Sequence, residues 1–404
     1  MRNHTTRAWI GLLAAVILVG APGAHADVVT EANAKAAEIA SRHPGTPIAV
    51  RMMAVVQVSV FEAVNAITGR YPTFRAKLTP APGGSVDAAV AAATRTALLK
   101  LMPAQQAAIE ADYQAALKSV PDGLAKSIGI PVGEQAAAAI LALSADDGAV
   151  APNSYRPHTT PGAYVPTSLP AVPHWGNRKP WVMTAGKQFR PAPPPSLTSE
   201  TWKQDLAEIK AVGGKNSPQR TPEQAAMARF WEATAPAVYW PVARSVANLP
   251  GRDVTDNARL LATAAMAMDD ALIAIFDAKY VYNLWRPLTA IRNADGDAGD
   301  PGWMPFIDTP MHPEYPCAHC IVSSSLAAVL RAEIGRGPRP TLSSVSPTAQ
   351  GARRTWASVD DFAQEVALAR IYDGVHYRFS TVVGSAMGKK IGELVVQSFP
   401  NPIH

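Results

Sequence analysis

The chain has 404 residues, 48% of them hydrophobic, and a formal net charge of +5. So small a positive excess argues against nucleic acid or an anionic membrane as a partner. With only two cysteines, Cys317 and Cys320, the chain is not a disulfide-stapled scaffold, and its length suffices for one large domain or two packed helical bundles.

The first 26 residues have the pattern of a signal peptide. Arg2 and Arg7 give a positive start, Ala8 to Gly20 is apolar but short for a membrane span, and Ala24-His25-Ala26 fits a peptidase site. We expect residues 1–26 to be removed and the protein to be exported, periplasmic or secreted. An uncleaved membrane anchor is the alternative. Later segments lack a long uninterrupted apolar run, which predicts no stable membrane insertion.

Alanine-rich segments with helical periodicity dominate the chain and predict an all-α fold of helical bundles. In 47–67, apolar residues recur every fourth position from Ile48 to Val64, which indicates one buried stripe. Few segments alternate as strands do. The expected helices are 28–42, 47–67, 85–118, 122–147, 202–213, 221–247, 256–285, 318–334, 360–372 and 375–398.

Residues 151–195 interrupt this pattern with eleven prolines. Proline removes an amide donor and disfavours helix in the preceding residue, so no regular helix is expected there. Five interspersed aromatic residues argue against a disordered linker. We predict an extended strap over 151–198 between an N-terminal helical half, 27–150, and a C-terminal bundle, 199–404, that holds the chemistry.

The first chemical motif is Lys279-Tyr-Val-Tyr-Asn-Leu-Trp-Arg286-Pro287, at the end of a strongly apolar segment. A spacing of seven is nearly two helical turns, which predicts that Lys279 and Arg286 project from one helix face. Pro287 would end that helix. Cations in an apolar helix need an anionic partner or a cleft, although a solvated basic edge is the plain alternative.

The second motif is Pro313-Glu-Tyr-Pro316-Cys317-Ala318-His319-Cys320, just before a predicted helix. The first amides of a helix lack intrahelical partners, and the helix dipole favours an anion there. His319 would stand beside such an anion and could donate a proton. The alternative is a helix cap with an incidental histidine.

The third motif runs from Arg370 to His376, with Gly374 expected to end one helix before another begins. His376 would then lie at a helix N-terminus, whose positive end lowers the imidazole pKa and keeps the ring neutral, as a nucleophile or ligand must be. On its own, His376 would be interpreted as a residue with a structural role. Together, two arginines, one lysine and two histidines beside helix breaks predict a site for a tetrahedral anion.

These motifs, in the order Lys-x6-Arg-Pro, Pro-x-x-His and Arg-x5-His, resemble the signature of the type 2 phosphatidic acid phosphatase and vanadium-dependent haloperoxidase superfamily. The surrounding residues are similar to the bacterial haloperoxidase-like branch. That similarity includes Trp285–Arg292, Pro313–Pro316, Gly374–Phe379, Phe61–Ala66 and Gly213–Thr221. The resemblance covers most of the mature chain and implies a helical-bundle fold with its site in the C-terminal bundle.

The resemblance also implies a role for each motif residue. Equatorial oxygens of vanadate or phosphate would be bound by Lys279, Arg286 and Arg370, supplemented by the amides around Cys317 and Ala318. His376 would be the axial group, bonding vanadium or attacking phosphorus. His319 would be the acid–base group near the opposite apical position.

Four residues depart from the family pattern. Cys317-Ala318 replaces Ser-Gly before the histidine; a thiol is a poorer donor and an oxidisable neighbour for peroxide. A Cys317–Cys320 disulfide would remove that difficulty, but the sequence leaves it open. Ala369 replaces a serine, and Ser380 replaces the aspartate that helps orient the site. Asp373 is a possible substitute for that aspartate.

Three other motifs give weaker indications of function. Asp295–Asp300 lacks the glycine and glutamate of a calcium loop and is interpreted as a surface turn. His312, His319 and the two cysteines do not match a common zinc spacing. Cys-Ala-His-Cys is also found in thiol–disulfide oxidoreductases, but their βαβ context is absent.

The leading hypothesis is a vanadium-dependent haloperoxidase-like enzyme, with vanadate as cofactor and hydrogen peroxide and halide as substrates. The first alternative is an acid phosphatase that needs no cofactor and acts on a phosphoester through a phosphohistidine at His376. The second is an inactive oxyanion-binding homologue. Halide preference and oligomeric state are not indicated by the sequence.

Overall fold

A computed structural model describes residues 27–166, 168–335, 337 and 339–403, and these are mostly helical, as the all-α prediction expected. The signal-peptide prediction falls on residues 1–26, outside the described residues. The N-terminal half holds α1 Val28–Ala40, α2 Thr46–Thr68, α3 Val86–Leu101, α4 Gln106–Lys118 and α5 Leu124–Ser144.

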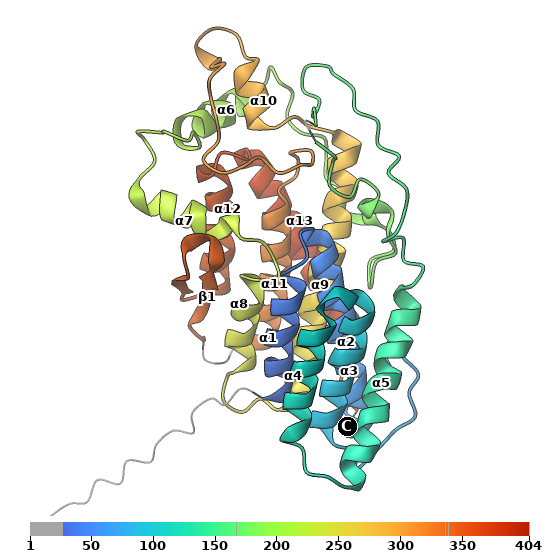
Figure 1. The fold of residues 1–404 in the computed structure, drawn as a ribbon. Helices are drawn as coiled ribbons and strands as arrows, with labels where there is room; N and C mark the ends of the chain where they lie inside the picture. Colours follow the sequence, from blue (N-terminus) through green and yellow to red (C-terminus); the bar gives the residue numbers. More distant parts are fainter. Residues whose placement is uncertain (1–26, 167, 336, 338, 404) are drawn as a thin grey trace, which may run out of the picture.

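The C-terminal half adds eight helices and one hairpin to the part of the chain that the structure describes (Figure 1). The helices are α6 Glu200–Val212, α7 Pro222–Glu232, α8 Tyr239–Ala247, α9 Val254–Tyr282, α10 Pro287–Arg292, α11 Ala318–Ile334, α12 Val359–Tyr372 and α13 Arg378–Ser398. The hairpin pairs β1 Leu342–Ser346 antiparallel to β2 Ala352–Trp356, with Leu342 opposite Trp356.

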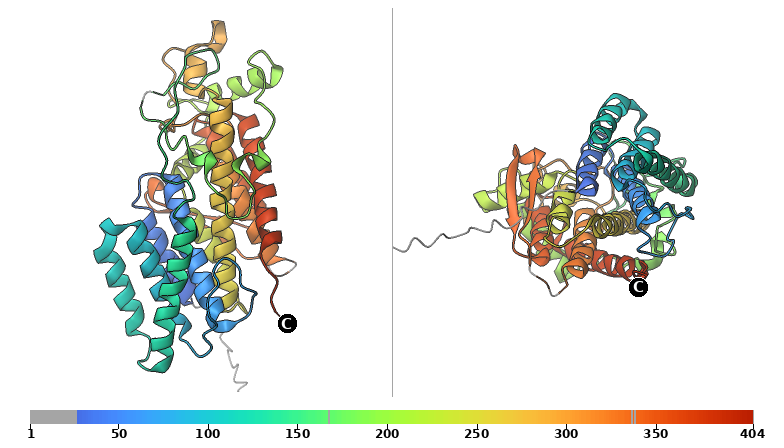
Figure 2. Two further views of the ribbon diagram at one scale, coloured as in Figure 1. Left: turned by 90° about the vertical axis from the view of Figure 1, so that its right-hand side faces the viewer. Right: turned by 90° about the horizontal axis from the view of Figure 1, so that it is seen from below.

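Helix α9 is the central element of the fold. Asp253 begins it with a capping box, and 22 of its 29 residues are buried. It packs against α2 on one side and against α11 and α13 on the other. Seen end-on in Figure 2, it lies between the blue N-terminal helices and the orange-to-red C-terminal ones. One hydrophobic core therefore joins the two halves.

Close packing of α13 against α11 depends on three glycines spaced four apart. A Cβ at Gly384, Gly388 or Gly392 would lie 2.6, 2.2 or 2.5 Å from backbone oxygens of Cys317, Ile321 and Ser325. Those distances are far shorter than any van der Waals contact, so only glycine allows this helix spacing. The contact brings the segment before α13 to the start of α11, where the motif histidines lie.

The predicted strap is observed as an extended segment between α5 and α6, with two short 3-10 turns, and it runs up one flank of the molecule (Figure 1). Buried charges attach it to the helices. Asp270 accepts hydrogen bonds from the amides of Trp181, Val182 and Met183. The strap's Arg178 pairs with Asp269 of α9 and with Asp147 just after α5.

Several predicted boundaries are wrong, each for a local reason. The expected helix 85–118 is interrupted at Met102, because Pro103 follows and cannot continue the hydrogen-bond ladder. The expected helix 221–247 is two helices separated by residues 233–238, which include Pro236. The hairpin and α10 were missed, since both are too short to show a period.

Two helices, α2 and α5, are long and apolar enough to pass a membrane-span test on length and composition. In α2, 89% of the tested window is buried inside the protein, as expected of a core helix. Helix α5 is less covered, with 39% buried, and packs against α3 through Gly129 and Gly133. Core helices pass the same test, so this is weak evidence for membrane insertion.

Candidate functional site

The end of α9 places two of the predicted cations. The helix stops at Tyr282, where Asn283 adopts a left-handed conformation (φ 49°), and Arg286 lies beyond the helix as the residue that precedes α10. The prediction that Lys279 and Arg286 share one face of a continuous helix is therefore wrong. Asparagine tolerates the left-handed turn and Pro287 starts α10 at its first position. A turn, not helical periodicity, brings both cations inward.

Lys279 and Arg286 are buried and bonded mainly to backbone carbonyls. Lys279 Nζ donates to the carbonyls of Pro313 (2.9 Å) and Glu314 (2.7 Å). Arg286 donates to the carbonyls of His312 (Nε, 2.9 Å) and Val375 (Nη1, 2.8 Å). Burial and the neighbouring cation lower the pKa of Lys279 well below its usual value. Burial lowers the pKa of Arg286 to about 10, although Glu314 raises it.

His376 lies two residues before α13 and is almost fully buried. Its Nδ1 is 2.7 Å from Glu314 Oε1, and its Nε2 is 3.4 Å from Arg286 Nη1. Burial, then Arg286 and Lys279, lower its pKa well below the usual value. The lowered pKa agrees with the expected neutral ring, and its main causes are burial and the neighbouring cations.

Arg370 brings the third buried cation from α12. Its Nη1 donates to the carbonyl of Trp231 (2.9 Å) and lies 2.8 Å from Asp373 Oδ2, while its Nε has no partner among the described residues. Burial raises the pKa of Asp373 to about 6, although Arg370 lowers it. Asp373 thus pairs with Arg370 and caps Val375, and the suggestion that it orients His376 is wrong.

The start of α11 holds the second motif. Cys317 and Cys320 form a disulfide, which answers the question that the sequence left open and removes them from any zinc site. The Cys317 amide donates to the carbonyl of Ser380 at 3.2 Å, so its predicted contact with an oxyanion is wrong: α13 packs so closely that Ser380 takes the donor. Ala318 is the first residue of α11, and the contact of its amide with an anion stays a prediction.

His319 follows on the first turn of α11 and is half-buried. Its Nε2 is buried without a hydrogen-bond partner among the described residues. Burial, then Arg370, lower its pKa well below the usual value. A neutral imidazole with an unsatisfied ring nitrogen beside Arg370 can exchange a proton with a bound group.

His312, His319, Arg370 and His376 line a cavity of about 300 Å³. Its wall also includes apolar side chains from α9 and α11, residues 44–47, the strap residues Ala171 and Val172, and the less buried carboxylates Glu232 and Asp308. The surrounding charge is unbalanced, because the buried cations Lys279, Arg286 and Arg370 outnumber the buried acids Glu314 and Asp373. An enclosed anion with several oxygens would restore the balance.

Sequence reasoning missed two residues of this site. Glu314 lies between Pro313 and Tyr315 in a motif that was singled out, but no spacing indicated that it reaches His376, 62 positions later. His312, whose Nδ1 lies 3.0 Å from Arg286 Nη2, was considered only as a zinc ligand. Both contacts depend on the fold of the whole C-terminal half.

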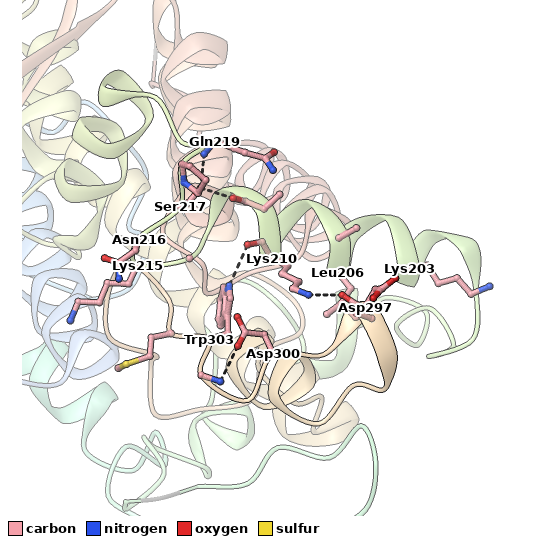
Figure 3. A pocket seen from close by; sticks show the side chains of 17 residues that line it. Lys203, Leu206, Lys210, Lys215, Asn216, Ser217, Gln219, Asp297, Asp300 and Trp303 are labelled. Carbon is pink, nitrogen blue, oxygen red and sulfur yellow. Dashed lines mark hydrogen bonds between the residues drawn. The ribbon is translucent and has the colours of Figure 1, made fainter.

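A larger surface cavity of about 650 Å³ lies between α6 and residues 297–304 (Figure 3). Its central polar groups satisfy one another: Lys210 Nζ donates to the carbonyls of Asp297 and Gly299, and Trp303 Nε1 donates to the Lys210 carbonyl at 3.3 Å. Its lining includes no histidine. The cationic site around His376 is therefore the stronger candidate.

Comparison with known protein families and sequences points to the same half of the chain. Residues 259–404 match the family model described as the VCPO second helical-bundle domain. The vanadium chloroperoxidase of Curvularia inaequalis is 30% identical over 211 residues, which are 43% of this chain and 34% of that protein. The match thus spans about a third of the length of this curated relative.

Solved structures extend the similarity to the whole fold. A bacterial vanadium-dependent iodoperoxidase has a TM-score of 0.79 and 25% identity, covering 92% of this chain and 96% of its own. A holo-type bacterial vanadium-dependent chloroperoxidase has a TM-score of 0.73 and 16% identity, covering 90% and 95%. Together with the family model, these similarities confirm the fold class and the haloperoxidase-like resemblance that the motifs indicated.

Proposed function

We propose that this chain, a member of the vanadium haloperoxidase-like branch by fold and by its C-terminal sequence, oxidises halide with hydrogen peroxide at a vanadate bonded to His376. The observation that carries the proposal is the buried excess of cations around one neutral imidazole. Vanadate is an oxyanion whose central atom accepts a nitrogen ligand, so it meets both features at once.

The donors present fit such an anion. Lys279 uses two of its three N–H groups on carbonyls, Arg286 Nη2 keeps one N–H, and Arg370 Nε is unsatisfied. The arginine planes and the lysine would bind the oxygens of the anion, and the Ala318 amide at the start of α11 would add a donor. His376 Nε2 would bond vanadium, because Nδ1 already contacts Glu314.

When bound, vanadate supplies the Lewis-acidic centre that activates hydrogen peroxide for attack by halide. The chain's residues do the remaining work. The three buried cations would compensate the anionic charge, because fixed charges act most strongly where they are shielded from water. His319, with its unsatisfied Nε2, would accept and return the proton exchanged with the bound oxyanion.

The disulfide favours the peroxidase over the phosphatase alternative. A free thiolate at Cys317, beside an electropositive pocket, would be oxidised by hypohalous product. Pairing with Cys320 removes that thiolate. The same pocket also suits phosphate, with His376 attacking phosphorus and His319 protonating the leaving group, so phosphatase activity is the second candidate.

The deciding experiment measures bromination by the purified mature protein with bromide and peroxide, before and after loading with orthovanadate. A parallel assay follows phosphate release from a generic phosphomonoester. We expect vanadate-dependent bromination that disappears in H376A and persists in H158A, a matched change of an exposed strap histidine. Phosphate release that vanadate inhibits, without bromination, would overturn the peroxidase proposal. Inactivity in both assays would favour an inactive anion-binding homologue.

We also propose that the mature protein is exported after removal of residues 1–26. The charged start, apolar stretch and Ala-x-Ala site support this. Asp27, the first residue after the expected cut, caps α1 through Thr30, so the mature chain would begin directly at a helix. Amino-terminal sequencing of the protein recovered from the periplasm or medium tests it, and an intact Met1 would contradict it.

A further inference from the structure

Glu314 makes the closest side-chain contact with His376. Its carboxylate is fully buried, and Oε1 lies 2.7 Å from His376 Nδ1 and 3.1 Å from the Tyr377 amide nitrogen. A backbone amide can only donate, so Oε1 is an acceptor in this arrangement. Burial raises the pKa of Glu314 to about 7, although Lys279 and Arg286 lower it. When this carboxylate is ionised, the imidazole Nδ1 that shares Oε1 carries the proton.

The other ring nitrogen faces Arg286. Arg286 Nη1 lies 3.4 Å from His376 Nε2, and a guanidinium can only donate. At that length the contact is weak, so it is compatible with an unprotonated Nε2 but does not select the tautomer by itself. An electrophilic centre bonded to the single lone pair of Nε2 would displace this contact.

Neighbouring groups do not supply the same contact. Ser380 Oγ is 3.5 Å from His376 Nδ1, at the outer limit of a hydrogen bond, and it carries no charge. Asp373 is engaged by Arg370 and the Val375 amide. Glu314 is thus the carboxylate that His376 contacts in the described part of the site.

We propose that Glu314 is the positioning residue for His376, holding it in the Nδ1–H tautomer and replacing, from another segment of the chain, the carboxylate that position 380 lacks. Only the identity of the group that Nε2 bonds rests on the proposed function. A carboxylate on the far nitrogen fixes ring orientation and raises the basicity of the bonding nitrogen, and loss of such a partner lowers metal affinity by roughly 10- to 100-fold.

The tautomer is measured directly by nitrogen-15 NMR of the protein labelled at histidine, with H376A to assign the signals. We expect wild type to show a protonated Nδ1 and an unprotonated Nε2. E314Q retains an acceptor oxygen and should keep this pattern, whereas E314A should move the proton to Nε2. An unchanged His376 pattern in E314A would overturn the proposal. This readout needs neither vanadate nor halide, so it stands apart from any failure of the proposed function.

Anion affinity supplies the second readout, with orthovanadate and inorganic phosphate measured in parallel. Phosphate reports on the cationic pocket without a bond to vanadium. We expect E314A to weaken vanadate binding by roughly 10- to 100-fold and phosphate binding by much less. Equal losses for both anions would indicate a loosened pocket and overturn the positioning role, as would vanadate affinity within about twofold of wild type.

The control is E62A, which removes a buried carboxylate of α2 that accepts hydrogen bonds from the Arg75 and Ala76 amides. It should leave both anion affinities unchanged. The rescue variant is E314A/S380D, because Ser380 already lies beside Nδ1. We expect it to restore the Nδ1–H tautomer and most of the vanadate affinity. Restoration of the tautomer without restoration of the vanadate affinity would overturn the proposal. If E314A does not fold, E314Q supplies the comparison with wild type.

Discussion

Helix α9 carries two buried charge clusters with opposite balance. Near its middle, Asp269 and Asp270 meet the strap, and Arg178 of the strap bonds Asp269 and Asp147; we call Asp147, Arg178, Asp269 and Asp270 the anchor cluster. More than two helical turns further along α9, Lys279 lies near Arg286 and Arg370, and carbonyls are the main acceptors for Lys279 and Arg286. In the anchor cluster Arg178 contacts two carboxylates, whereas in the cationic site Arg370 contacts Asp373 but Lys279 and Arg286 contact no carboxylate among the described residues.

The pKa values of the arginines record this difference. Burial lowers the pKa of Arg178, but Asp269 and Asp147 outweigh it and the net pKa is raised. Burial also lowers the pKa of Arg286, and the charges of Glu314 and Asp373 raise it too little to compensate, so it falls to about 10. The same side chain, equally buried, is stabilised as a cation in one cluster and destabilised in the other. A balanced cluster indicates structure, and an unbalanced one indicates a ligand.

Removing one partner should damage the anchor cluster most. D269A leaves Arg178 buried with half of its ion pairs, and breaking such a pair costs about 3–5 kcal/mol of unfolding free energy. Denaturant unfolding at pH 7 measures it. D297A, at an exposed position, is the control and should change stability by less than about 0.5 kcal/mol. A loss below about 1 kcal/mol in D269A would break the comparison.

The same kind of change in the cationic site should affect binding more than stability. K279M removes a buried charge that has no carboxylate contact, and this relief offsets the two lost hydrogen bonds to carbonyls. We expect the unfolding free energy to change by no more than about 1 kcal/mol, while phosphate affinity falls about 30-fold, the equivalent of about 2 kcal/mol. Calorimetry of both processes would test this. A stability loss matching that of D269A would contradict it.

Acid should affect the anchor cluster through Asp147. Burial raises the pKa of Asp147, but hydrogen bonds and charges of Arg51 and Arg178 outweigh it, so the net pKa is lowered. A depressed carboxyl pKa stabilises the fold above its unfolded value near 3.8, and this stability is lost as the pH falls further. D147N should therefore be less stable than wild type at pH 7, and their unfolding free energies should converge below about pH 4. A gap that stays constant with pH would exclude this ion-pair contribution.

The sequence predicted those parts of the fold whose signals are local. Apolar periodicity located the long helices, and the prolines located the strap. Helix α10 has fewer than two turns, and the hairpin is a single pair of five-residue strands. Both are too short to show a hydrophobic period. Pro103 and Pro236 ended helices that alanine-rich composition seemed to continue, because a single residue outweighs propensity summed over its neighbours.

The candidate site shows the same limit of prediction from local sequence signals. The motifs named Lys279, Arg286, Arg370, His319 and His376. The structure places His319, Arg370 and His376 on one cavity, with Arg286 against His376 and Lys279 bonded to the Glu314 carbonyl. Their partners could not be predicted. The contact of Glu314 with His376, and that of the Cys317 amide with Ser380, join segments more than 60 positions apart and exist only after the helices pack.

The glycines of α13 restrict which point mutations the protein can tolerate. Any single-base change in a glycine codon that alters the amino acid introduces a Cβ or a stop, and at Gly384, Gly388 and Gly392 a Cβ meets a backbone oxygen of α11. Every single-base missense change at these three codons is therefore expected to disrupt packing, although none of the three residues belongs to the cationic site. In a library of random point mutants selected for function, we expect them to be as intolerant of change as His376 itself.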